Sequence, residues 1–120
     1  MSGSERRSQI LSVVSNKAIS DCLDRLGIYH SSQGYKYLML GIRAILDGEV
    51  DRYCVKEVYD YVSKRVGVQA GQVDHAIRYA IRKTEDPVPN KEFLIRVADD
   101  LMLTADANVF LFESADRPGG

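Results

Sequence analysis

The strongest constraint on this fold is a pair of amphipathic helical patterns in residues 51–85, joined by a connection that contains glycine. In the second pattern, about 70–83, apolar residues recur at steps of three and four and therefore share one helix face. That face is formed by Val73, Ala76, Ile77, Ala80 and Ile81. At about 100° per residue, the opposite face presents His75, Arg78 and Arg82. A core can hold such a helix by one face while the other face reaches outward.

The connection between the two patterns has the features of a helix-turn-helix. Such a motif needs a small residue in its first helix, a glycine in the turn and a branched apolar residue in its second helix. The small residue allows close approach, the glycine supplies a positive φ, and the branched residue locks the helices together. Ser63, Gly67 and Val73 occupy these places. We therefore expect the helix at about 70–83 to enter the major groove of DNA, although helical hairpins in other proteins satisfy the same pattern.

The remaining sequence divides into further helical patterns. One runs from Ser8 to Leu26 and is interrupted at Ser15 and Asn16, which allows a second piece to begin near Lys17. The pattern over 34–48 is apolar on most sides, as is typical of a central helix. Ser31 and Ser32 precede this central helix and can cap it.

A third pattern covers about 53–66 and leads into the turn, and a last helix is expected to follow Asn90 as its cap. After Thr104, the apolar run 109–112 fits either a short strand or an extended tail on the core. Together, these patterns predict an all-α fold, a compact bundle of about five helices that contains a helix-turn-helix.

Length and composition are typical of one soluble globular domain. The chain has 120 residues, of which 45% are hydrophobic and 28% charged. We expect a disordered N-terminus at 1–7, the helix-turn-helix DNA-binding domain at 8–104 and a C-terminal tail at 105–120. Cys22 and Cys54 have no metal spacing, so we expect reduced, largely buried thiols in a cytoplasmic protein. No apolar run is long enough to span a membrane.

The charge is unevenly distributed. A net charge of −1 and a pI near 6.1 argue against a histone-like basic coat but allow a local basic patch. Between residues 62 and 84 the single acid is Asp74. The basic residues there are Lys64, Arg65, Arg78, Arg82 and Lys83. This imbalance favours a DNA-facing surface; the alternative is an ordinary solvated helix face.

The chemistry of each side chain suggests a role on DNA. Arg78 can fork onto guanine O6 and N7, and Gln72 and His75 can contact a base or a phosphate. Asp74 either accepts from cytosine N4 or orients a basic neighbour. Phosphate contacts position without specifying, and the residues suited to them are Lys64, Arg65, Arg82 and Lys83. Tyr79 fits either a phosphate hydrogen bond or partial burial.

The sequence does not favour an enzyme. Its two histidines, His30 and His75, lie in different segments, and no His, Cys or carboxylate cluster has metal spacing. The glycines at 67 and 71 lack the following Lys-Ser/Thr of a phosphate loop. We therefore expect no catalytic residue, no cofactor and no metal.

Three segments of the sequence are informative together: GYKYLMLGIRAILDG, YVSKRVGVQAGQVDHAIRYAIRK and PNKEFLIRVADDLML. Over roughly 17–103, they resemble the C-terminal effector domain of the master sporulation response regulator of endospore-forming Firmicutes. It implies an all-helical helix-turn-helix domain that binds double-stranded DNA as tandem subunits and switches transcription. In the recognition helix, Arg78 matches the family outright, Asp74 is a shortened Glu, and His75 and Tyr79 are replacements.

The resemblance also bears on other partners. In the family, the segment between the recognition helix and the last helix is longer and contacts RNA polymerase sigma factor; here it shrinks to about 84–89. It further implies pairing of two copies on DNA. The receiver domain of the family is absent from the 120 residues. The alternative to DNA binding is a helix-turn-helix fold used for protein binding, as a partner or antagonist of a transcription regulator.

Overall fold

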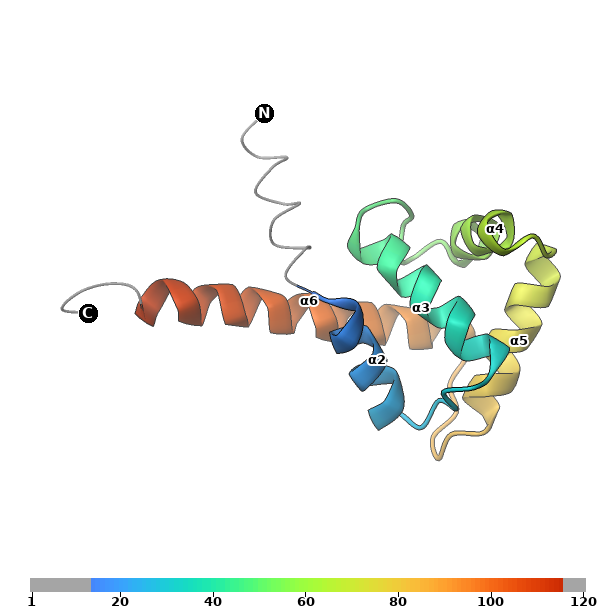
Figure 1. The fold of residues 1–120 in the computed structure, drawn as a ribbon, viewed down its shortest axis with the longest axis horizontal. Coiled ribbons are helices and arrows are strands. Elements are labelled where there is room, and N and C mark those ends of the chain that lie inside the picture. The colour runs from blue at the N-terminus through green and yellow to red at the C-terminus, as the bar shows by residue number, and fades with distance from the viewer. Residues whose placement is uncertain (1–13, 116–120) are drawn as a thin grey trace.

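A computed structural model describes the backbone of residues 14–115 and the side chains of residues 14–104. Five α-helices follow one another in this part of the chain (Figure 1). They are α2 Asn16–Arg25, α3 Gln33–Leu46, α4 Val55–Val66, α5 Ala70–Arg82 and α6 Asn90–Ala115. The predicted all-α bundle of about five helices is confirmed. The predicted disorder at 1–7 and the helical pattern that begins at Ser8 lie outside the described residues.

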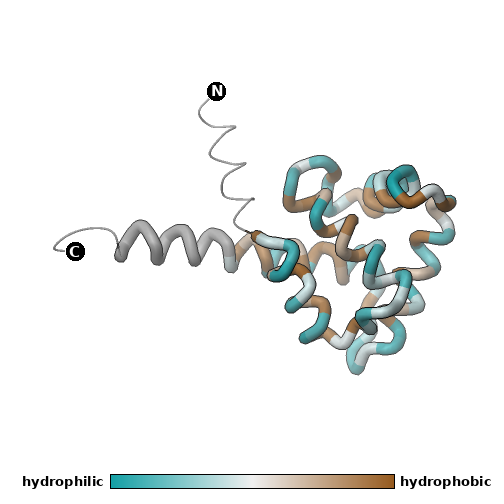
Figure 2. The backbone as a smooth tube through the Cα atoms, viewed as in Figure 1, coloured by the Kyte–Doolittle hydropathy of each residue, from teal (hydrophilic) through white to brown (hydrophobic). Residues whose placement is uncertain are grey.

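The central helix is α3, as its nearly uniform apolar pattern predicts. It packs against α2, α4, α5 and α6 (Figure 1). Its side chains Leu38, Ile42 and Leu46 are completely buried. Hydrophobic residues recur along every helix of the globule, so each helix contributes one face to a single core around α3 (Figure 2).

A glycine allows α3 and α5 to cross closely. A Cβ atom added to Gly34 would lie 2.5 Å from the Ala76 carbonyl oxygen and 2.6 Å from the Ala80 Cβ. Both distances are shorter than real carbon contacts, and one of them involves backbone that cannot rotate away. The start of α3 therefore rests directly on the middle of α5 and determines how deeply α5 sits in the core.

Serine and aspartate side chains set where helices begin. The Ser15 hydroxyl accepts the Ala18 N–H at 3.1 Å, so α2 begins at Asn16. Ser32 caps α3 in the same way, which confirms one of the two predicted caps. Helix α4 starts at Val55, later than the predicted start near Tyr53. An Asp51 carboxylate oxygen accepts the Tyr53 N–H at 2.9 Å and holds a turn there instead.

Two predictions about the last helix are wrong. Asn90 does not act as a cap outside α6, because it is the first helical residue and its side chain turns inward onto α4 and α5. The run 109–112 is neither a strand nor an extended tail, because α6 continues to Ala115. The segment after Thr104 contains alanines, which favour a helix, and the next proline comes only at 118.

Two further observations concern membrane-spanning helices and the state of the two cysteines. In the described part of the chain, none of the helices is both long enough and apolar enough to cross a membrane. Cys22 and Cys54 are both free thiols; Cys22 is buried and Cys54 is partly exposed. Burial raises the pKa of the Cys22 thiol, which keeps it in its unreactive protonated form.

Candidate nucleic-acid interface

A left-handed glycine makes the turn between α4 and α5. Gly67 has φ 75° and ψ 31°, and its N–H donates to the Ser63 carbonyl at 2.9 Å. Other residues adopt this conformation only with strain, so glycine is required here. Val73, the third residue of the predicted motif, is completely buried. Of the three pattern positions, Gly67 therefore makes the turn and Val73 packs into the core.

The first turn of α5 uses one of the predicted DNA contacts for its own cap. The Gln72 side-chain oxygen accepts the Gln69 N–H at 3.0 Å. This bond satisfies a backbone donor that an isolated helix end would leave unpaired. The Gln72 amide NH₂ group stays available at the exposed start of the helix.

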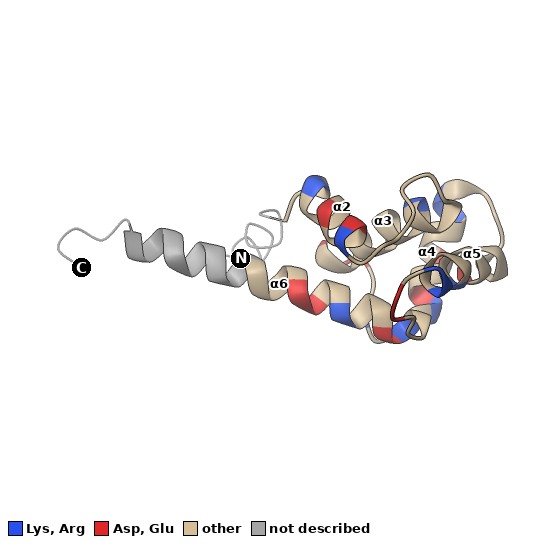
Figure 3. Cartoon of the chain, turned by 90° about the horizontal axis from the view of Figure 1, so that it is seen from below, with Lys and Arg blue, Asp and Glu red and all other residues tan. Residues whose placement is uncertain are grey.

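One face of α5 is held by the core, and the opposite face is exposed. The buried residues of the helix are Val73, Ile77, Ala80 and Ile81. The outer face carries His75, Arg78, Tyr79 and Arg82, all exposed. Figure 3 places basic positions on α5 and in the turn that follows it, next to the acidic connection that leads to α6. The structure therefore brings the predicted side chains of α5 onto one surface.

Asp74 and Arg78 form an ion pair along the edge of this face. The Arg78 Nη2 atom lies 2.9 Å from one Asp74 carboxylate oxygen and 3.1 Å from the other. The sequence left two roles for Asp74, accepting from a base or orienting a basic neighbour. This geometry favours the second, because the carboxylate already faces a guanidinium.

Several other predicted residues lie at the two ends of the helix pair. Lys83 Nζ lies 4.3 Å from the centre of the Tyr79 ring, which is 55% exposed. Arg65 lies over the ring of Tyr61 at 4.4 Å. Within the described residues, Lys64 makes no ion pair. Lys64 and Arg65 occupy the last turn of α4, and Lys83 follows the last residue of α5.

Sequence reasoning missed two residues that support this surface. The Asn90 side-chain amide, at the start of α6, donates to the Tyr59 hydroxyl at 2.9 Å and to the Asp74 carboxylate at 2.9 Å. It also donates to the Asp74 backbone carbonyl at 3.1 Å. An asparagine before a helical pattern predicts a cap, so no local signal could have indicated this role.

Burial changes the titration of Tyr59. Desolvation raises the pKa of its phenol, the hydrogen bond from Asn90 opposes the rise, and the negative charge of Asp74 adds to it. The neutral phenol is therefore the form that accepts from Asn90 across the whole physiological pH range.

This raised pKa predicts a loss of stability in alkali. The folded chain favours the protonated phenol, so the free energy of unfolding is unaffected below the unfolded pKa of about 10 and falls as pH rises past it. We expect the Tyr59→Phe variant to lose less stability than the wild type between about pH 8 and pH 11 in urea unfolding. Tyr29→Phe, which removes an exposed phenol, is the control. Identical pH profiles for Tyr59→Phe and the wild type would contradict the assignment.

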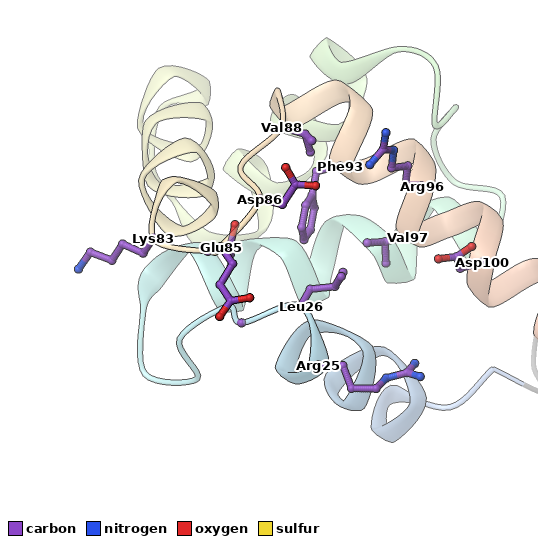
Figure 4. A pocket seen from close by; sticks show the side chains of 12 residues that line it. Arg25, Leu26, Lys83, Glu85, Asp86, Val88, Phe93, Arg96, Val97 and Asp100 are labelled. Atoms are coloured by element: carbon purple, nitrogen blue, oxygen red, sulfur yellow. The ribbon is translucent and has the colours of Figure 1, made fainter.

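A separate hollow of about 570 Å³ lies between the end of α2, the connection after α5 and the start of α6 (Figure 4). Leu26, Val88, Phe93 and Val97 give it an apolar lining. Its charged side chains are Arg25, Lys83 and Arg96 together with Glu85, Asp86 and Asp100. Because both signs are equally represented, this hollow has no preference for an anion such as DNA. Among the described residues, no group of three or more His, Cys, Asp or Glu side chains could hold a metal ion.

The fold and this surface define an all-helical domain built around a helix-turn-helix, with a basic outer face on its second helix. The chain matches the family described as "Sporulation initiation factor Spo0A C terminal" over residues 19–101. It therefore belongs to this family, the DNA-binding effector domain of a sporulation regulator, and the predicted resemblance is confirmed. The match ends at Leu101, the last residue of α6 whose side chain is described as buried. Neither a curated protein nor a solved structure matches the chain significantly.

Proposed function

We propose that this chain is a sequence-specific DNA-binding regulator of transcription whose helix α5 lies in the major groove. The observation that supports it most is the two-faced nature of α5. Four of the five residues of its apolar face are buried, whereas its outer face exposes two arginines, a histidine and a tyrosine. A helix held in this way presents side chains to base edges without losing its place in the core.

Within the proposal, the nine candidate residues divide by role. Arg78 reads a base, and Gln72, His75 and Tyr79 contact bases or phosphates beside it. Asp74 orients Arg78. The remaining residues neutralise phosphates and position the domain; they are Lys64, Arg65, Arg82 and Lys83. The proposed domain covers 8–104, with 105–120 as a C-terminal tail. Pairing of two copies on DNA and contact with sigma factor through 84–89 are further proposals that rest on the family alone.

Selection from randomised double-stranded DNA tests the proposal. We expect enrichment of one motif, with an affinity that falls by about 0.9 log units per log unit of salt for each phosphate contact. The double variant Arg78→Ala/Arg82→Ala should lose the motif. The control, Arg25→Ala/Arg96→Ala, removes the same charge from the hollow of Figure 4 and should keep it. No enrichment by the wild type at low salt would contradict the proposal.

The second candidate is binding of a protein instead of DNA. The hollow between α2 and α6 supports it, because an apolar lining ringed by charges of both signs is typical of a protein contact (Figure 4). Under this alternative the randomised DNA yields no motif. The Arg25→Ala/Arg96→Ala variant, and not the α5 variant, then loses the partner.

A further inference from the structure

Asn90 connects three helices through one buried amide. It is 8% exposed, and in the part of the chain where burial is described the other buried residues are apolar, tyrosine, cysteine or glycine. A buried amide is costly unless its hydrogen bonds are made. Its NH₂ group meets the Tyr59 hydroxyl from α4 and the backbone and carboxylate oxygens of Asp74 from α5. The start of α6 is thereby tied to the α4–α5 pair.

Asp74 links the Asn90 amide to Arg78 on the outer face of α5. One of its carboxylate oxygens accepts from Asn90 at 2.9 Å, and both oxygens face Arg78 Nη2. An exposed ion pair one helical turn apart stabilises a helix only slightly, and its long side chains usually sample many conformations. Here the Asp74 carboxylate is fixed in place, because the buried Asn90 amide donates to it. The Arg78 side chain is therefore restrained on one side only.

Part of the Arg78 guanidinium remains free to donate hydrogen bonds to a base. Its ion pair with Asp74 uses Nη2 alone, and within the described residues no acceptor engages Nε or Nη1. A forked contact with a guanine pairs one Nη2 hydrogen with the Nε or the Nη1 hydrogen, so the guanidinium can make it while its other Nη2 hydrogen points to Asp74. Side chains ordered before binding lose less entropy when they bind.

We propose that Asn90 is a positioning residue that acts through Asp74 to present Arg78 to DNA, so that a residue outside the recognition helix controls discrimination at the base pair that Arg78 reads. The inference rests on the proposed function. It assigns specificity to the junction of α4, α5 and α6, and it assigns Asn90 no contact with DNA.

The first test needs no DNA. Side-chain ¹⁵N relaxation of the arginine Nε–H groups reports how ordered each guanidinium is. We expect Arg78 to be more ordered than Arg82 in the wild type and to become as mobile as Arg82 in Asn90→Ala. The control is Asn16→Ala, which removes an asparagine that accepts from Arg43 at 3.0 Å, outside α5. Unchanged order of Arg78 in a folded Asn90→Ala chain would overturn the inference.

The second test is a double-mutant cycle on the selected DNA site. Discrimination is the ratio of affinities for that site and for a site altered at the base pair of Arg78. We expect Asn90→Ala to lower this ratio about twofold to tenfold, the effect of ordering one side chain before binding. In the Arg78→Ala background, Asn90→Ala should lower it no further. A structural defect alone would weaken both sites equally, and additive losses would overturn the inference.

Asp74→Asn covers the case in which Asn90→Ala does not fold. It keeps the size of the side chain but removes the charge that holds Arg78, and Asp74 is only partly buried. Full Arg78 order in Asp74→Asn would overturn the inference on its own. If Arg78 responds as expected but the wild type enriches no DNA motif, the proposed function fails and the positioning of Arg78 stands. The two failures are therefore distinguishable.

Discussion

Replacing Gly34 by alanine should destabilise the fold by about 1–3 kcal/mol, the typical cost of forcing an extra methyl into a packed core. The added Cβ would lie 2.5 Å from the Ala76 carbonyl oxygen, so α3 and α5 must move apart. Because α5 carries the proposed DNA surface, the separation should also weaken DNA binding. Urea unfolding of the variant, with the midpoint and slope compared with those of the wild type, measures the loss.

The matched control is Gly71→Ala, in the first turn of α5. A Cβ there meets no atom within 4 Å, and alanine favours a helix over glycine by about 0.5–1 kcal/mol. The control should therefore be neutral or stabilising, although the chemical change is identical. If Gly34→Ala proved as neutral or stabilising as Gly71→Ala, helix propensity, and not the close α3–α5 crossing, would govern Gly34.

Replacing Arg78 by alanine should cost about 1–3 kcal/mol of discrimination at one base pair, the usual value for a forked arginine contact. The structure supports this expectation, because Arg78 is exposed on the outer face of α5 and held by Asp74. Binding titrations against the selected site and its single-base variants would locate the affected pair. Discrimination at the remaining pairs should be preserved.

Lys64→Ala is the control that separates reading from positioning. Lys64 is exposed in the last turn of α4, where its charge suits a phosphate. Its loss should weaken all DNA sequences about equally and reduce the salt slope by about 1. If Arg78→Ala and Lys64→Ala behave alike, the division between the two kinds of residue is wrong.

Much of the fold could be predicted because the relevant signals are local. Apolar residues at helical spacing located each described helix. Ser32 caps the start of α3 and Gly67 ends α4, as their chemistry predicts. The errors arose where a local signal competed with a distant partner or was absent. Asn90 looks like a cap, but a buried site beside Tyr59 and Asp74 uses its amide instead. Beyond Thr104 no glycine or proline stops α6 before Ala115.

The candidate surface divides in the same way. Periodicity alone placed His75, Arg78 and Arg82 on one face of a helix, because 3.6 residues per turn determine which side chains share a side. What each side chain does there depends on neighbours that are remote in sequence. Gln72 partly caps its own helix, and Asp74 is held by a residue of α6.

The sequence by itself determined that this chain forms a helix-turn-helix with a basic outer face, because helical period, glycine conformation and charge are properties of short segments. Only the tertiary structure decided how deeply α5 sits against α3 and how Arg78 is held. Those features depend on Gly34 meeting Ala76 and on Asn90 meeting Asp74. Both contacts join residues far apart in the chain, so they depend on how the helices pack and not on any one segment.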